Sequence, residues 1–220
     1  MKVILHNSLS LDGSLLGFDA DLAAHYRIAG GFKAGIRLVG SETALAGLKT
    51  FYRKLPAERE KDLVKPDANP RLPLWVIPDT HGRLKNKLHV LRQSGCCRDV
   101  VILTASHTPK SYLHYLTERH YDWHYMGKRP IQYDHAFEVL EREYKARTLL
   151  VDAGKTLNGI LLNAGLVDGI SLLVHPALAG SGRFPLFADL KADGRLRLLK
   201  HKSVAGKLWL HYKVEAPGKG

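Results

Sequence analysis

Four short segments of the chain carry most of the side chains that could do chemistry. They comprise residues 6–13 (HNSLSLDG), 39–45 (VGSETAL), 77–83 (IPDTHGR) and 151–159 (VDAGKTLNG), and each begins at the end of an apolar run. Their carboxylates, hydroxyls, glycines and cationic side chains are groups that can hold an anion and move a proton. We therefore expect an anionic ligand and acid–base chemistry at these positions.

Residues 151–159 are the most informative of the four segments. Asp152 ends an apolar run, and a small-residue loop at Gly154 leads to Lys155 and Thr156 at the start of a predicted helix. Such a loop leaves backbone N–H groups available to a phosphate, and Lys155 adds a positive charge. The alternative is an ordinary strand-to-helix turn in which Thr156 is the N-cap, and the spacing does not decide between them. The segment matches neither the GxGxxG nor the Walker A pattern.

Two further segments could complete a dinucleotide site. Residues 39–45 repeat the order of strand, Gly40 and helix, and two such loops could hold the two ends of a dinucleotide. Thr80 and Arg83 follow the third apolar run, and an arginine at that place suits a ribose 2′-phosphate. The alternative for Arg83 is a solvated surface arginine.

Asp12 and Asp152 are candidates for a proton donor or for a group that orients a hydroxyl, because both follow predicted strands. Asp12 precedes Gly13, and since Asp-Gly is a common turn pair, turn formation is the alternative for Asp12. The histidine-rich segment 120–135 contains no HExxH pattern or recurrent ligand pair, so we expect no metal site. The sequence also contains no GxSxG motif, which disfavours hydrolase chemistry.

The apolar runs that position these groups are short and separated by turn signals, as in strands that alternate with helices. Residues 207–214 alternate apolar and polar side chains, which predicts an antiparallel strand with one open face. The pattern predicts an α/β fold with a mostly parallel central sheet, helices on both faces and residues 1–220 in a single domain. Residues 56–73, rich in charge and proline, predict an exposed excursion. We expect other strands at residues 3–5, 36–39, 74–77, 100–103, 148–151 and 170–174, and helices at 21–29, 41–52, 135–145 and 157–164.

Charge and composition narrow the choice of partners. Lys and Arg number 33 against 21 Asp and Glu, and the formal net charge of +12 favours an anionic partner: nucleic acid, a membrane surface or a phosphorylated small molecule. No apolar run reaches the length of about 18 residues that a membrane span needs, and the N-terminus has no secretory cleavage site. Cys96 and Cys97 are adjacent, which disfavours a disulfide between them and a zinc pair. We therefore expect a cytoplasmic protein without membrane association.

Taken in order, these motifs resemble the reductase domain of the riboflavin-biosynthesis deaminase/reductase family, the RibD C-terminal family. Residues 10–13 match its S-L-D-G pattern, residues 40–43 match its G-x-x-T, and residues 69–70 with 79–83 resemble its N-P and D-S/T-x-x-R. Residues 152–159 are similar to its acidic residue followed by G/A-G-x-T-L-x-G, residues 165–168 to its G-L-V-D, and residues 176–181 to its P-x-x-x-G-G/S. The likeness covers most of the chain.

The resemblance implies a dihydrofolate-reductase-like fold and an NADPH-dependent reductase. Such an enzyme opens the ribosylamino group of a pyrimidine 5′-phosphate and delivers a hydride to the sugar, and family habit implies a homodimer. Together with the strand-end positions, the resemblance indicates catalytic roles for Asp152, Asp12 and His6 and substrate contacts from Ser10, Arg27 and Asp152. The cofactor site would be made by Ser8, Gly40, Thr43, Thr80, Arg83, Gly154, Lys155, Thr156, Leu157, Asn158, Gly159 and Ile160.

The chain departs from the family pattern near the expected substrate. The family often has Lys at the position of His6 and Glu at the position of Asp152, and its stretch with an arginine for the substrate phosphate is replaced by residues 46–54. The zinc ligands of the family's deaminase module are absent, so a stand-alone reductase is expected. Its substrate could be the ribosylaminopyrimidine phosphate of the family or another pterin-like or phosphorylated compound. The missing arginine could be replaced by Arg27, Lys49 or Arg53, and the sequence does not select one.

Two other functions stay open from the sequence. A nucleic-acid-binding domain could use the basic and aromatic residues of segment 112–129. That function is less favoured, because the basic residues are scattered and no RRM, KH or helix-turn-helix signature is present. The chain could also be a family member that binds a dinucleotide without catalysis.

Overall fold

The computed structural model describes residues 1–67, 69–128, 130–191 and 193–215. The chain divides into two compact units. The first unit contains Met1–Ala34 and Thr148–Gly220, and the second unit contains Gly35–Arg147. Residues 216–220 of the predicted domain lie outside the described residues. The first unit is therefore built from both ends of the chain, and the second unit from the sequence between them.

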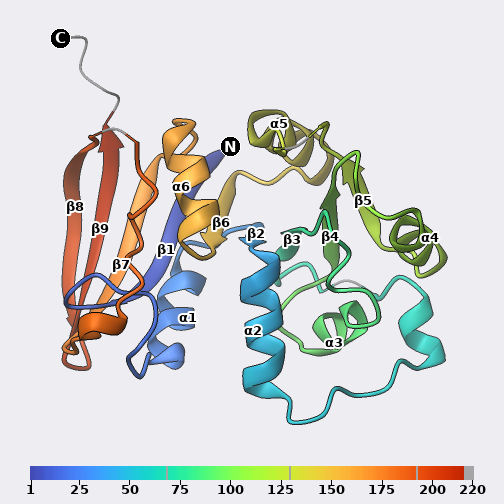
Figure 1. Ribbon diagram of the computed structural model, residues 1–220, viewed down its shortest axis with the longest axis horizontal. Helices are drawn as coiled ribbons and strands as arrows, with labels where there is room; N and C mark the ends of the chain where they lie inside the picture. The colour runs from blue at the N-terminus through green and yellow to red at the C-terminus, as the bar shows by residue number, and fades with distance from the viewer. Residues whose placement is uncertain (68, 129, 192, 216–220) are drawn as a thin grey trace. The chain divides into compact units, whose positions relative to one another are not determined.

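A mixed sheet is the frame of the first unit (Figure 1). Its strands are β1 (Lys2–Ser10), β6 (Thr148–Asp152), β7 (Gly169–His175), β8 (Arg195–Val204) and β9 (Lys207–Glu215), in the order β6-β1-β7-β9-β8. β1 is parallel to β6 and β7, whereas β9 is antiparallel to β7 and β8. The helices of this unit are α1 (Leu22–Gly31) and α6 (Lys155–Asn163), with a short 3-10 helix η2 (Gly180–Gly182).

The two α-helices of the first unit cover opposite faces of its parallel strands. On one face, Ile4 of β1 packs with Leu150 of β6 and Ala29 of α1. On the other face, Nδ2 of Asn158 in α6 donates to Oδ1 of Asn7 at 2.9 Å. Side chains alternate between the faces along a strand, so the even-numbered residues of β1 after Ile4 also point toward α1.

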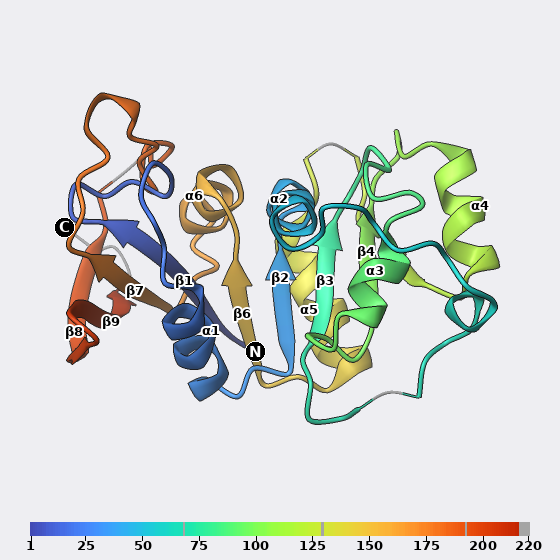
Figure 2. The ribbon, with the colours of Figure 1, turned by 90° about the horizontal axis from the view of Figure 1, so that it is seen from below.

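A parallel sheet is the frame of the second unit. Its strands are β2 (Ile36–Val39), β3 (Leu74–Pro78), β4 (Val100–Thr104) and β5 (Asp122–Tyr125), in the order β5-β4-β3-β2. Figure 2 shows β2, β3 and β4 side by side with the same direction. β4 is buried along its whole length, as an apolar strand covered on both faces should be. The helices are α2 (Ser41–Phe51), η1 (Glu60–Leu63), α3 (Leu88–Gln93), α4 (Lys110–Glu118) and α5 (Tyr133–Tyr144).

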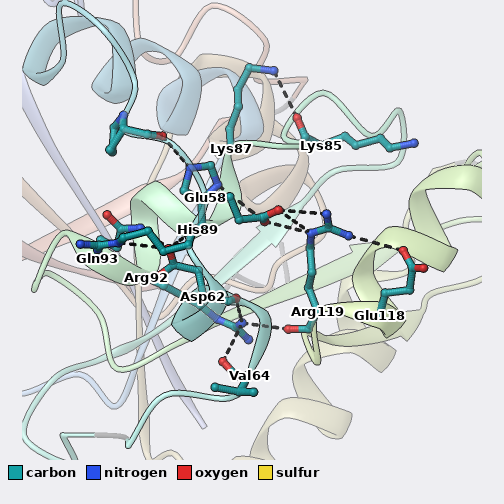
Figure 3. Close-up of polar contacts among 12 residues, drawn as sticks. Glu58, Asp62, Val64, Lys85, Lys87, His89, Arg92, Gln93, Glu118 and Arg119 are labelled. Atoms are coloured by element: carbon teal, nitrogen blue, oxygen red, sulfur yellow. Dashed lines mark hydrogen bonds and ion pairs between the residues drawn. The ribbon is translucent and has the colours of Figure 1, made fainter.

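Residues 56–73 run along the surface of the second unit, and most of them are exposed as predicted. Two arginines nevertheless fix this segment to the core (Figure 3). Arg92 of α3 donates to the backbone oxygen of Asp62 at 3.3 Å, and Arg119 forms an ion pair with Glu58 at 2.9 Å. The excursion is therefore held at two points by charge-assisted contacts.

The structure confirms the predicted α/β fold class with its mostly parallel strands and antiparallel C-terminal strand. The prediction for residues 36–39 coincides with β2. The predicted strand 3–5 is shorter than β1, because the second half of β1 is mostly polar and lacks the apolar run on which the prediction rested. The elements β5, β8, α3 and α4 were not predicted. β8 is exposed along almost its whole length and carries basic side chains, so it lacks the apolar pattern of a buried strand. The single domain over residues 1–220 stays a prediction.

Candidate active site

Four polar side chains of the first unit meet where β1 and β6 approach α1, and we name them the histidine cluster: His6, Ser8, His25 and Asp152. Nδ1 of His25 lies 3.1 Å from Oγ of Ser8, and its Nε2 lies 3.6 Å from Oδ2 of Asp152. The rings of His6 and His25 are in contact, with centroids 4.3 Å apart and planes tilted by 30°. The structure thus brings three predicted site residues together around His25, which the sequence did not predict.

The hydrogen bonds of His6 define where its proton lies. Its Nε2 is 3.1 Å from the backbone oxygen of His25, which can only accept, so Nε2 carries the proton. Its Nδ1 accepts from the hydroxyl of Ser171 at 2.9 Å, and that hydroxyl oxygen accepts the indole N–H of Trp209 at 2.9 Å. Burial, followed by the neighbouring His25, lowers the pKa of His6 to about 4. His6 is therefore neutral at neutral pH and supports His25, while its catalytic role stays a prediction.

The start of α1 places His25. Asp21 is the N-cap of this helix, since its Oδ1 accepts the N–H of Ala24 at 2.9 Å. The backbone oxygen of Asp21 accepts the N–H of His25 at 3.0 Å, which puts His25 in the first turn. His25 and the buried Ala29 are four residues apart and share the face that packs on the sheet. A histidine on an apolar helix face was the signal in the sequence that could have indicated it.

Ser10, the last residue of β1, and Asp12 in the turn that follows form a second polar group, and they hold backbone. Oδ1 of Asp12 accepts the Ser10 hydroxyl at 2.5 Å and the N–H of Ala179 at 3.1 Å, and its Oδ2 accepts the N–H of Gly180 at 3.0 Å. These hydrogen bonds, with that from Ser10 first, lower the pKa of Asp12 to about 2. Asp12 is thus ionised at neutral pH and fastens its turn, as the turn alternative anticipated. Its catalytic role, and the substrate contact of Ser10, stay predictions.

The loop between β6 and α6 leaves the start of the helix without a side-chain cap. The N-cap is Gly154 and the helix begins at Lys155, so Thr156 is its second residue and does not cap it. A Cβ built on Gly154 would meet no heavy atom within 4 Å, so a ligand could approach the backbone there. An uncapped helix start with open backbone N–H groups has the features of a phosphate site.

Asn158 fastens this loop from inside the unit. Its Nδ2 donates to the backbone oxygen of Ala153 at 2.9 Å, and Nδ2 of Asn7 donates to the same oxygen at 2.8 Å. The side chains of Leu157 and Asn158 are buried, and Gly159 is buried as well. These three predicted cofactor residues therefore pack inside the first unit and hold the start of α6 in place.

Lys155 and a surface hollow lie along the exposed side of α6. Nζ of Lys155 is 3.7 Å from Oδ1 of Asp189 and 4.8 Å from the centre of the Phe184 ring. The hollow has a volume of about 410 Å³ and includes three predicted cofactor residues. Its lining consists of Thr156, Gly159, Ile160, Asn163, Ala164, Asp189 and Lys191.

In the second unit, Arg83 lies beside the start of α2. Gly40 is the N-cap of α2 and no side chain caps this helix, while the Arg83 guanidinium forms an ion pair with Glu42 in the first turn. The buried carboxylate of Asp79 fixes the loop after β3, because it accepts the N–H groups of Arg83 and Leu84 at 3.0 and 2.9 Å. Arg83 is thus a half-exposed, ion-paired arginine rather than a freely solvated one.

Thr43 and Thr80 are partly buried at the same two places, Thr43 in the first turn of α2 and Thr80 two residues after β3. A dinucleotide site that combines these residues with those of the first unit stays a prediction. The three alternatives for the substrate phosphate, Arg27, Lys49 and Arg53, are all exposed.

The aromatic side chains of segment 112–129 belong to the core of the second unit. Tyr112, Tyr115 and Tyr121 are 1%, 3% and 3% exposed, and Tyr115 stacks with each of the other two. Bases stack on accessible aromatic faces, so this segment does not support the nucleic-acid alternative. Arg129 lies outside the described residues. Within the described ranges, no helix combines the length and the apolar character that crossing a membrane requires.

The model of the RibD C-terminal domain matches residues 1–210, so the chain belongs to the RibD C-terminal domain family. Family membership confirms the predicted dihydrofolate-reductase-like fold and the predicted class of enzyme, an oxidoreductase of the riboflavin-biosynthesis kind. No curated protein matches the sequence.

Solved structures share this fold at low sequence identity. A pyrimidine reductase-like protein of Corynebacterium diphtheriae is 17% identical with a TM-score of 0.73, over 98% of this chain and 92% of that chain. The riboflavin biosynthesis reductase of Saccharomyces cerevisiae is 18% identical with a TM-score of 0.69, over 97% and 90%. RibD of Acinetobacter baumannii is 21% identical with a TM-score of 0.70, and the match covers 97% of this chain but 58% of RibD.

Proposed function

We propose that this chain is an NADPH-dependent reductase of a ribosylaminopyrimidine 5′-phosphate, such as 5-amino-6-(5-phosphoribosylamino)uracil. One observation carries the proposal: the carboxylate of Asp152 ends β6 two residues before the uncapped helix start at Gly154 and Lys155. A group that can transfer a proton is therefore adjacent to a group that can bind a phosphate. A reaction between a phosphorylated sugar and a dinucleotide needs both.

NADPH fits the residues at the helix starts. In the first unit, the N–H groups at the start of α6 and the charge of Lys155 suit a phosphate of the dinucleotide. In the second unit, we propose Gly40, Thr43, Thr80 and Arg83 as further ligands, with Arg83 for the 2′-phosphate. When bound, NADPH supplies the hydride, and the side chains of the chain orient the ligands and transfer the proton.

The proposed class of substrate is supported by the solved structures of similar proteins and by Asp152 of the histidine cluster. The relative from Saccharomyces cerevisiae is a riboflavin biosynthesis reductase, and that from Corynebacterium diphtheriae is a pyrimidine reductase-like protein. We propose that Asp152 contacts the sugar of such a substrate, because it is partly exposed at a strand end. A cytoplasmic homodimer in which both units form one domain belongs to the same proposal.

Binding and turnover together test the function. Fluorescence titration should show tighter binding of NADPH than of NADH, and NADPH absorbance should decrease when the ribosylaminopyrimidine phosphate is added. Asp152→Asn should lower kcat and leave the NADPH dissociation constant close to the wild-type value. NADPH binding without turnover of any ribosylaminopyrimidine would favour the non-catalytic alternative, and failure to bind NADPH would refute the proposal.

A further inference from the structure

We propose that His25 relays the proton consumed by the reductase reaction, between Ser8 and Asp152. This role rests on the proposed function and concerns a residue that no sequence motif indicated. The three side chains come from β1, α1 and β6, and all of them belong to the first unit.

The two ring nitrogens of His25 connect the other two groups. Nδ1 is 3.1 Å from Oγ of Ser8, which is a hydrogen bond, and Nε2 is 3.6 Å from Oδ2 of Asp152. The second distance exceeds that of a direct hydrogen bond, and catalytic hydrogen bonds are often long before the substrate binds and tighten in its complex. An imidazole between a hydroxyl and a carboxylate can take a proton at one nitrogen and release one at the other.

The groups around His25 favour a proton on the nitrogen that faces Asp152. The neutral His6 on β1 contacts the ring of His25, and Asp152 approaches Nε2 from β6. Tyr26 of α1 lies perpendicular to the ring of His25, with centroids 4.9 Å apart. His6 does not compete for the proton, because both of its own nitrogens are hydrogen-bonded. The side chains of His25 and Asp152 are only 7% and 14% exposed, so water has little direct access to this pair.

The proposed reaction adds one hydride and one proton to the substrate. The C1′–O4′ bond breaks as the glycosidic nitrogen forms a double bond to C1′, so that O4′ keeps the electron pair of the broken bond and takes a proton through Asp152, and C1′ then receives the hydride. Asp152 takes that proton from Nε2 of His25 while Nδ1 takes the hydroxyl proton of Ser8, and a proton from solvent replaces the one that Ser8 gives up. The ring loses one proton and gains one in this transfer, and it returns to its first tautomer by exchange with solvent after the product leaves.

The full-length His25→Gln variant tests the relay during turnover. With saturating NADPH and ribosylaminopyrimidine phosphate, kcat should decrease by about 100-fold, while KM and the NADPH dissociation constant stay close to the wild-type values. Without the relay the proton reaches Asp152 directly from solution, so kcat of the variant should fall by up to about tenfold per pH unit as the pH rises. His114→Gln, the same change at a histidine side chain that is 74% exposed on α4, should keep the wild-type rate and pH profile.

A second measurement requires no turnover. Nitrogen NMR of the free protein should show the His25 proton on Nε2, because the relay requires Nδ1 to accept from the Ser8 hydroxyl and Nε2 to face Asp152. Ser8→Ala and Asp152→Asn should each change these nitrogen shifts, and His114→Gln should not. If circular dichroism shows that His25→Gln does not fold, Ser8→Ala takes its place and should lower kcat without changing the secondary structure.

The outcomes separate the relay from the proposed function. A folded His25→Gln enzyme that keeps the wild-type kcat and pH profile overturns the relay, and so does a wild-type His25 that carries its proton on Nδ1 alone. A wild-type protein that never oxidises NADPH with a ribosylaminopyrimidine phosphate overturns the proposed function instead.

Discussion

Charge reversal at Lys155 tests the position proposed for the cofactor. Lys155 is the first residue of α6, its side chain is 29% exposed, and its ammonium lies 3.7 Å from Oδ1 of Asp189. A hydrogen bond that involves a charged group contributes about 1.5–3 kcal/mol. Lys155→Glu removes such a contact with a phosphate and adds a like charge, so we expect a loss of about 2–4 kcal/mol. The NADPH dissociation constant should therefore rise roughly 30- to 700-fold.

The same substitution should leave the fold intact, because a negative side chain at a helix N-terminus interacts favourably with the helix dipole. Fluorescence titration measures the change in NADPH affinity, and thermal unfolding provides the control for stability. Asp189→Asn is the matched variant: it removes the anion that competes for Lys155, so NADPH binding should stay equal or become tighter. A Lys155→Glu protein with the wild-type dissociation constant would refute the placement of the cofactor at this helix start.

Burial lowers the pKa of His6 from 6.5 to about 4 in the folded protein. As the pH decreases, the unfolded chain therefore binds this proton before the folded protein does. The free energy of unfolding should decrease by roughly 3 kcal/mol when the pH is lowered from 6.5 to about 4. Urea unfolding should show that fall in the wild type and lose it in His6→Gln. Gly82→Ala would put a Cβ 2.9 Å from Cγ of Tyr112 at a φ of +68°, and should cost about 2–3 kcal/mol. Gly95→Ala, with a φ of +69° and open space, should cost about 1 kcal/mol, and equal losses in thermal unfolding would contradict the steric argument. Arg92 forms a buried ion pair with Asp99, with Nε 2.7 Å from Oδ1. Arg92→Met leaves the Asp99 carboxylate without this partner and should lower the free energy of unfolding by about 3–5 kcal/mol, whereas a loss below about 1 kcal/mol in urea unfolding would show that the Arg92–Asp99 pair is dispensable.

Apolar runs were sufficient to predict the buried strands and insufficient for the exposed ones. β2 was predicted with its observed bounds because all of its hydrophobic residues are buried. In β8, Leu196 and Leu198 are 44% and 46% exposed and alternate with basic residues, so no buried face marks the strand. β5 is four residues long and mostly polar, and its strand conformation depends on pairing with β4 rather than on its own sequence.

The candidate site was predictable where its residues are consecutive. Asp152, Gly154 and Lys155 follow one another at a strand end, so their proximity is a local property of the sequence. His25 approaches Asp152 only because β1 pairs with β6 and α1 packs on both strands. The apolar face of α1 indicates that His25 points toward the sheet, but the spacing of residues does not show which strand end it meets. Sequence motifs alone therefore could not pair His25 with Asp152.

The residues that carry the motifs and those that carry the proposed chemistry are largely different. The carboxylate of Asp12 is occupied by one hydroxyl and two backbone N–H groups, and the amide of Asn158 holds the loop before α6. Both motif residues therefore fix backbone that other groups use. Ser8, His25 and Asp152 instead contact one another through atoms that can exchange protons. The motifs in this chain identify the framework of the site, and its acid–base chemistry has to be sought among the side chains that this framework brings together.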